Sequence, residues 1–237
     1  MISHFRDLYL LTPPTVFAPR SDAGDLIDAA RPLVKGDLLD VCTGSGVVAL
    51  SLAPLARSVV AIDRNSMAVA AARANALLNR RRVRVLRGDL FAPVRGRRFD
   101  YVVANPPYVP TAQTGRRPRG AAAWDGGHDG RAVLDRLCRE APTYLRPGGR
   151  LLLVQSSLAD HDRTIDLLAG VGLQPAVMTA RRGPLGPIAQ AQMSHLKTSC
   201  AFNAEPTEEI IVIAARKLVD HARLRLEHSP RPDTLGE

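Results

Sequence analysis

Short apolar runs recur along the chain, and most are followed by a stretch with helical spacing. Strands are expected over 37–42, 58–62, 83–86, 99–104, 150–155, 173–179 and 209–215, where apolar or alternating runs end at turn-forming or polar residues. Helices are expected over 47–55, 66–78, 131–145 and 160–169. This alternation predicts one α/β domain with a doubly wound, mostly parallel, seven-stranded sheet. Ligands bind such sheets at the carboxyl ends of the strands.

Three segments fall outside this alternation. Residues 1–36 include Pro13-Pro14 and a helix that ends near Ala30, and they could fold over a ligand as a lid. Residues 181–207 contain two Gly-Pro pairs and are expected to form a long loop without secondary structure. Residues 218–237 are expected to form a C-terminal helix and tail. The domain proper is therefore predicted to cover 37–217.

Composition argues against several classes of protein. The 237 residues are 46% hydrophobic, which suits one domain with a sizeable core but not two full domains. There is no run of 18 apolar residues and no signal-peptide layout at the N-terminus, so we expect a cytoplasmic protein without a membrane partner. The three cysteines are widely spaced, which argues against a disulfide framework and a structural zinc site. No metal is expected.

The formal net charge of +9 suggests a possible nucleic-acid partner. Lysine accounts for only three of the 32 basic residues, and such an arginine bias can reflect coding composition. The arginine clusters at 80–82, 95–98 and 116–119 therefore fit a solvated surface and an anionic partner equally well.

Aspartates follow three successive predicted strands, beside a glycine-rich turn. The turn 43–46 (TGSG) would bring the backbone close to a ligand at a helix N-terminus, although a dehydrogenase could share it. Asp63 lies 23 residues after Asp40, at the end of the second strand, where a carboxylate can accept both hydroxyls of a ribose. Asp89 follows the third strand and could accept a hydrogen bond from an adenine amino group. Each aspartate alone could be a helix cap or turn former, but together they predict a nucleoside-containing cofactor.

The tetrapeptide Asn105-Pro106-Pro107-Tyr108 follows the fourth predicted strand. The side-chain oxygen of Asn105 and the carbonyl of Pro106 offer two acceptors to one NH2 group, and the Tyr108 ring offers a flat face to a planar amide or base. A strand that ends in a Pro-Pro turn is the structural alternative. The turn and aspartates upstream favour the chemical interpretation. We therefore predict a site that holds an amino group for alkylation, with Asn105, Pro106 and Tyr108 as its catalytic residues.

Together these motifs resemble the class I S-adenosylmethionine-dependent methyltransferases that methylate amino groups. Residues 122–131 and 145–149 are similar to the release-factor glutamine N5-methyltransferases. Segment 17–22 resembles the Tyr-x-Pro-x-Glu-Asp segment of their shorter, archaeal and eukaryotic-type branch. Departures are Phe17 and Ser21 in place of its Tyr and Glu, Cys42 at a usually small position, and a longer 181–207 segment.

The resemblance implies S-adenosyl-L-methionine as cofactor and a glutamine side-chain amide in a peptide release factor as acceptor. It also suggests a small activating partner subunit. Adenine N6 or guanine N2 methylation of RNA or DNA is one alternative, and N-methylation of a small molecule is another. The cofactor-binding residues implied are Asp40, Thr43, Gly44, Gly46, Asp63, Arg64, Asp89, Leu90 and Asn105.

Two side chains of the segment 111–130 have two interpretations each. Trp124 could stack on the acceptor or anchor the segment in the core, and the anchor is favoured. His128 is explained by a solvated turn as well as by a catalytic role, and the turn is favoured.

Overall fold

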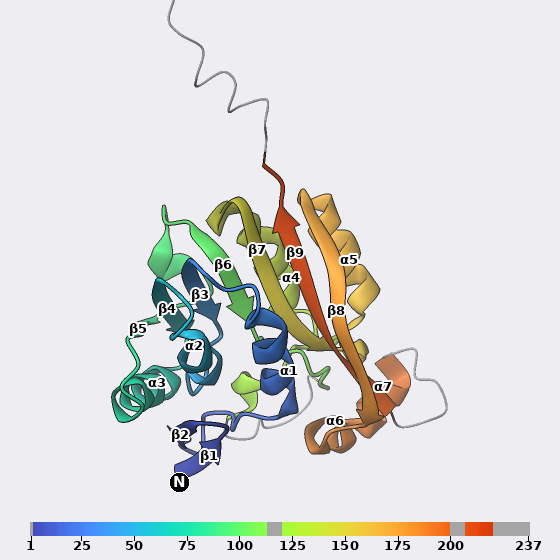
Figure 1. Cartoon of the computed structure of the whole chain (residues 1–237). Coiled ribbons are helices and arrows are strands. Elements are labelled where there is room, and N and C mark those ends of the chain that lie inside the picture. The colour runs from blue at the N-terminus through green and yellow to red at the C-terminus, as the bar shows by residue number, and fades with distance from the viewer. Residues whose placement is uncertain (1, 113–119, 200–206, 220–237) are drawn as a thin grey trace, which may run out of the picture.

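The computed structural model describes residues 2–112, 120–199 and 207–219. Its main sheet has the strand order β5-β4-β3-β6-β7-β9-β8 (Figure 1). Strands β5 to β7 in this order pair in parallel, whereas β9 is antiparallel to both β7 and β8. The predicted mostly parallel, seven-stranded sheet is confirmed. The strands are β3 (Asp37–Val41), β4 (Ser58–Asp63), β5 (Arg84–Arg87), β6 (Phe99–Ala104), β7 (Leu145–Ser156), β8 (Leu173–Pro184) and β9 (Thr207–Lys217).

Helices cover both faces of the sheet (Figure 1). Neighbouring residues of the central strands face opposite sides, so that Leu38 belongs to one core cluster and Leu39 to the other. Burial on both faces explains why these strands read as continuous apolar runs. One face carries α1 (Ser21–Ala30), α2 (Val47–Leu52) and α3 (Ser66–Leu78), and the other carries α4 (Leu134–Tyr144) and α5 (His161–Gly170). Short 3₁₀ turns cover Ala92–Val94, Ala121–Ala123 and Ser157–Ala159.

The segment between β8 and β9 is not the structureless loop that was predicted. Strand β8 continues to Pro184 because its pairing with β9 extends to the Pro184–Thr207 pair. Two helices follow, α6 (Pro187–Ala191) and α7 (Met193–Ser199). A small separate core of Leu185, Ala189 and Leu196 holds them together. Gly186-Pro187 begins a helix instead of a loop, because proline in the first turn lacks only an N–H that would have no partner there.

Strands β1 (Ile2–Phe5) and β2 (Leu8–Leu11) form an N-terminal hairpin that was not predicted. The side chain of Asn75 in α3 and that of Asn79, the residue after α3, hold it. The amide of Asn79 bonds the N–H and C=O of Tyr9 at 2.9 and 2.7 Å, and that of Asn75 bonds those of Leu11 at 2.7 and 3.1 Å. Residues four apart on a helix and two apart on a strand are both spaced by roughly 6–7 Å, so the two amides act like a neighbouring strand.

Asn75 also connects this hairpin to the glycine-rich turn. Its Nδ2 donates to the carbonyl of Ser45 at 2.9 Å, and the side chain is fully buried. Further along the N-terminal segment, Asn65 Nδ2 donates to the carbonyl of Thr15 at 3.1 Å. Helix α3 and the residue before it therefore set the position of residues 9–15 relative to the turn after β3.

No helix of the described ranges is long and apolar enough to span a bilayer. Cys42 and Cys138 are free thiols. The predictions for the cluster 116–119, for Cys200 and for the tail after residue 219 lie outside the described residues.

Replacing the buried amide of Asn75 should destabilise the protein strongly. Asn75→Leu leaves the N–H and C=O of Leu11 and the carbonyl of Ser45 without this partner, which should cost on the order of 3 kcal/mol of unfolding free energy. Chemical denaturation measures this loss. Asn79→Ala is the matched control, and because its bonds to Tyr9 are exposed, water can replace them at a smaller cost. Equal losses in the two variants would contradict the role of Asn75.

Candidate active site

A cavity of 380 Å³ lies at the carboxyl ends of the strands, where ligands bind in this class of sheet. Small-molecule sites have volumes of roughly 300–1,000 Å³, so the cavity has room for a ligand. The N-terminal segment contributes Thr15, Val16 and Phe17 to the lining. Its other walls follow β3, β4, β5 and β6 and include Thr43–Ser45, Asp63–Asn65, Gly88–Leu90 and Asn105–Val109.

The glycine turn and Asp63 form one unit on the cavity wall. The amide of Gly44 donates to Asp63 Oδ2 at 2.9 Å, and the amide of Asn65 donates to Oδ1 at 2.9 Å. Each carboxylate oxygen keeps a lone pair, so that Asp63 can accept two more donors. Gly44 has a φ of +55°, and a Cβ there would meet no atom within 4 Å. The backbone is therefore open to a ligand at this point.

Asp40 and Gly46 do not line the cavity. Asp40 Oδ2 accepts the hydroxyl of Thr43 at 2.5 Å and the amide of Ala49 at 3.1 Å. Burial raises the pKa of Asp40 to about 7, although these two hydrogen bonds oppose the shift. Gly46 has a φ of +86°, and a Cβ there would approach the Ala72 Cβ to 3.2 Å. Both residues shape the turn. The other predicted cofactor residues line the cavity: Thr43, Gly44, Asp63, Arg64, Asp89, Leu90 and Asn105.

Asp89 has a partner that the sequence did not suggest. Its Oδ2 accepts a hydrogen bond from Arg136 of α4 at 2.7 Å, and both side chains are about half exposed. The next residue, Leu90, is buried and has a φ of +43°. Arg136 therefore fixes the direction of the Asp89 carboxylate at the edge of the cavity.

Asp22 joins the two polar side chains of the tetrapeptide after β6. Its Oδ2 accepts Asn105 Nδ2 at 3.1 Å and the Tyr108 hydroxyl at 2.9 Å, and its Oδ1 accepts the amide of Ala23 at 2.7 Å. Asp22 lies in the first turn of α1 and is 6% exposed. Because the NH2 group of Asn105 is bonded to this carboxylate, the side-chain oxygen Oδ1 of Asn105 remains free to accept a hydrogen bond from a ligand.

Sequence reasoning assigned no role to Asp22. The only signal was its place in the segment 17–22 that resembles a family motif. Burial, together with the charge and hydrogen bond of Asp22, raises the pKa of Tyr108 well above its usual range. Tyr108 therefore stays protonated and acts as a donor to Asp22.

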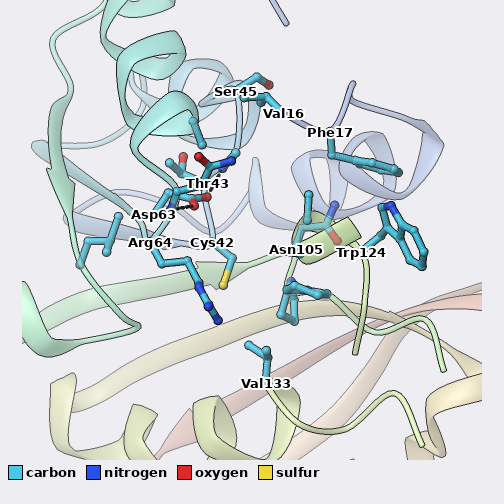
Figure 2. Close-up of a pocket in the computed structure, with 18 of the residues that line it drawn as sticks. Val16, Phe17, Cys42, Thr43, Ser45, Asp63, Arg64, Asn105, Trp124 and Val133 are labelled. Atoms are coloured by element: carbon cyan, nitrogen blue, oxygen red, sulfur yellow. Dashed lines mark hydrogen bonds between the residues drawn. The ribbon is translucent and has the colours of Figure 1, made fainter. Parts of the chain in front are cut away.

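Aromatic side chains form the end of the cavity near Asn105. Figure 2 shows Phe17 and Trp124 on the side of Asn105, with Asp63 and Arg64 on the other side. Trp124 is half-buried, lines the cavity and belongs to none of the core clusters of the described residues, so it does not anchor the segment in the core as predicted. His128 is exposed and does not line the cavity, and its ring centroid lies 4.7 Å from that of His195. This position fits the turn residue that was favoured.

Comparisons with known proteins point to one family. The family described as "Methyltransferase small domain" matches residues 7–118. A putative protein N5-glutamine methyltransferase of Methanocaldococcus jannaschii is 33% identical over 186 residues, which cover 78% of this chain and 94% of that protein. A release factor glutamine methyltransferase of Geobacter sulfurreducens is 34% identical over 179 residues, which cover 71% of this chain and 62% of that enzyme.

Two solved structures share the fold. One is the E. cuniculi Mtq2–Trm112 complex, which is responsible for the methylation of the translation termination factor eRF1. Its matched chain superposes with a TM-score of 0.62 at 22% sequence identity, and the match covers 86% of this chain and 99% of the matched chain. The other is the T. thermophilus 16S rRNA N2 G1207 methyltransferase in complex with AdoMet and guanosine; its TM-score is 0.60 at 19% identity, over 92% of this chain and 50% of that one.

The sheet order and the solved structures show a Rossmann-like fold, and the matched family and the relatives define the chain as a methyltransferase. Within that class, its similarity over nearly the whole length of the M. jannaschii protein is decisive. The chain belongs to the protein N5-glutamine and release-factor glutamine methyltransferase family.

Removing the Asp22 carboxylate should slow methyl transfer without weakening the binding of S-adenosylmethionine. In Asp22→Ala the amide of Asn105 and the hydroxyl of Tyr108 lose their shared acceptor, so Asn105 can turn its NH2 group towards the acceptor. We expect kcat to fall by about 10²-fold, the loss typical of a misplaced transition-state contact. Steady-state kinetics and calorimetry measure the two effects. Asp28 lies on the same helix as Asp22 and forms an exposed ion pair with Arg6. The control Asp28→Ala should therefore change neither kcat nor the affinity for S-adenosylmethionine.

The buried carboxyl of Asp40 should give the unliganded protein a pH-dependent stability. Its pKa is about 7 in the folded protein, against an ordinary value of 3.8, so between these two values the folded state holds a proton that the unfolded state has released. The unfolding free energy of the wild type should therefore fall as pH rises through this window, with a slope approaching about 1.4 kcal/mol per pH unit.

The variant Asp40→Asn keeps an oxygen for Thr43 and Ala49 but has no carboxyl to titrate. Urea denaturation at pH values from below 4 to above 7 measures the unfolding free energy of both proteins. Between these pH values the unfolding free energy of Asp40→Asn should fall less steeply than that of the wild type. Identical pH profiles for the variant and the wild type would contradict the assignment.

Proposed function

We propose that this enzyme transfers a methyl group from S-adenosyl-L-methionine to the side-chain amide nitrogen of a glutamine in a peptide release factor. The observation that carries the proposal is the orientation of Asn105. Because Asp22 binds its NH2 group, Asn105 presents Oδ1 as an acceptor, and the Pro106 carbonyl supplies a second acceptor for one planar NH2 group. The names of the relatives support the choice of acceptor.

The residues present fit S-adenosylmethionine. The two free lone pairs of Asp63 suit the ribose hydroxyls, and the open backbone at Gly44 suits the methionyl part together with Thr43. Asp89 and Leu90 would bind the adenine, and Arg64 lines the same wall. Asp40 and Gly46 would support this binding by holding the turn. When bound, the cofactor supplies a strongly electrophilic methyl group on a sulfonium centre.

The remaining task of the enzyme is to orient a weak nucleophile. The lone pair of an amide nitrogen is delocalised into its carbonyl. Two acceptors that bind both N–H groups direct the nitrogen at the methyl group and favour its pyramidal form, so they stabilise the transition state more than the ground state. Alignment with the reacting bond can contribute roughly 7–11 kcal/mol in favourable cases. The nitrogen loses its proton after transfer, when it is acidic, so no general base is required.

The two arginine clusters within the described residues lie away from the cavity. Clusters 80–82 and 95–98 precede β5 and β6 and so lie near the amino ends of these strands. The cavity lies at the carboxyl ends. Neither of these two described clusters is in place to bind phosphates beside an acceptor base.

We further propose that the enzyme acts in the cytoplasm, where release factors act, and that it works with a small activating subunit. The Mtq2–Trm112 complex, which shares the fold, supports this second part.

Asn105→Ala should slow turnover strongly while cofactor binding survives, because the substitution removes an acceptor for the substrate amide and leaves the contacts of Asp63 and Gly44 in place. We expect a loss in kcat of about 10²–10³-fold. Single-turnover transfer of a labelled methyl group and calorimetric titration with S-adenosylmethionine measure the two quantities. A parallel loss of both would contradict the role of Asn105.

The acceptor can be identified with methyl-labelled cofactor, purified enzyme and fractionated cell extract. We expect label that protease releases on a Gly-Gly-Gln peptide and nuclease does not release. Nuclease-sensitive label would overturn the proposed acceptor in favour of RNA or DNA.

A further inference from the structure

The chain that follows the tetrapeptide pairs with the segment that carries Trp124. The amide of Val109 donates to the carbonyl of Trp124 at 3.0 Å, and the amide of Gly126 donates to the carbonyl of Val109 at 2.9 Å. Residues 109–111 and 124–127 therefore lie side by side as two short segments that pair in parallel. We call this pair of segments the clasp.

The side chain of Asp125 joins the two segments of the clasp. Its Oδ1 accepts the hydroxyl of Thr111 at 2.5 Å and the amide of Gly127 at 2.9 Å. The amide of Thr111 donates in turn to the carbonyl of Gly127 at 2.8 Å. Thr111 is 6% exposed, so water has little access to replace the carboxylate if it is removed.

The chain between the clasp and α4 packs tightly against its surroundings. A Cβ on Gly130 would come within 2.5 Å of the carbonyl oxygen of Tyr108. The next residue, Arg131, is 2% exposed and donates to Asp135 Oδ1 at 2.7 Å and to the carbonyl of Asp160 at 2.6 Å. The far end of this chain is therefore held by α4 and its neighbours, and Asp125 holds the near end.

The clasp forms part of the wall of the 380 Å³ cavity, since Trp124 and Asp125 both line it. Figure 2 shows the Trp124 ring beside Asn105 and away from Asp63. Because the carbonyl of Trp124 is bonded to Val109, the clasp sets the position of the residue from which the ring projects. The clasp thus determines the shape of the end of the cavity proposed for the acceptor, and not of the end proposed for the ribose.

We propose that Asp125 is a positioning residue for methyl transfer, which closes the clasp and so holds the Trp124 ring in the wall of the acceptor site before a substrate binds. The inference rests on the proposed function, because it takes the end of the cavity at Asn105 to be the place of the acceptor amide. Asp125 acts through Oδ1 as a hydrogen-bond acceptor, so the role does not require its charge.

This role predicts a particular kinetic effect. Without the Asp125 side chain, the ring stands in its place in only a fraction of the molecules, and the apparent affinity for the acceptor falls by that fraction. Binding of the acceptor closes the clasp again, so that turnover at saturation is nearly unchanged. The cofactor groups at Asp63 and Gly44 keep their contacts.

Kinetics of three variants test the assignment. Asp125→Ala should raise the KM for a Gly-Gly-Gln peptide about tenfold, while kcat and the Kd for S-adenosylmethionine stay within about twofold of the wild type. Asp125→Asn keeps an oxygen for Thr111 and Gly127 and should restore a KM near that of the wild type. The control is Asp162→Ala, which removes a carboxylate that is 87% exposed on α5 and does not line the cavity. An unchanged KM in Asp125→Ala, or an equal rise in Asp125→Asn or in the control, would overturn the inference.

The fluorescence of Trp124, the only tryptophan of the chain, reports on the clasp whatever the acceptor is. In Asp125→Ala the emission maximum should move to longer wavelength, because the ring becomes more exposed to water. Thr111→Val should cause a smaller shift, and the double variant should shift no further than Asp125→Ala, because Thr111 acts through Asp125. Circular dichroism checks that each variant is folded.

A wild-type emission maximum in both folded single variants, or additive shifts in the double variant, would overturn the role of Asp125 in holding the ring. Failure of the proposed function would appear differently, as a wild-type enzyme that methylates no glutamine peptide. The emission shifts would then still show that Asp125 positions Trp124, and the part of the inference that concerns the glutamine acceptor would be overturned.

Discussion

The site depends on one buried carboxylate. Asp22 accepts hydrogen bonds from Asn105, from Tyr108 and from the amide of Ala23, so its charge is compensated although the side chain is almost inaccessible. A buried carboxylate without such donors would be strongly destabilising, which makes this geometry self-consistent. The same contacts determine which atom of the Asn105 amide remains free to accept a hydrogen bond from a ligand.

The position of Asp22 depends in turn on how the N-terminal segment is held. Asn75 and Asn79 bind the backbone of β2, and Asn65 binds the carbonyl of Thr15, a few residues before α1. Arg181 holds the other side of α1 through Asp25. Hydrogen bonds thus connect the glycine turn, the N-terminal segment with α1, the tetrapeptide after β6 and the end of β8.

The central strands and α3 could be predicted because burial on one or two faces leaves a local periodic pattern, and α3 has the predicted bounds Ser66–Leu78. The turn and Asp63 were predictable because they follow strands directly in the sequence. The role of Asp22 was not, since it lies 83 residues from Asn105 and no local pattern records that contact. The hairpin and α6 were missed for related reasons. The hairpin is stabilised by distant asparagine side chains, and Gly186-Pro187 is compatible with both a loop and a helix start.

The orientation of Asn105 is the claim on which the mechanism depends, and a crystal structure of the enzyme with S-adenosylhomocysteine and a glutamine peptide would test it most directly. We predict that the amide nitrogen of the peptide lies within hydrogen-bonding distance of Asn105 Oδ1 and the Pro106 carbonyl, with Asn105 Nδ2 still bonded to Asp22. A complex in which Nδ2 of Asn105 faces the peptide, or in which the glutamine amide binds away from both acceptors, would contradict it.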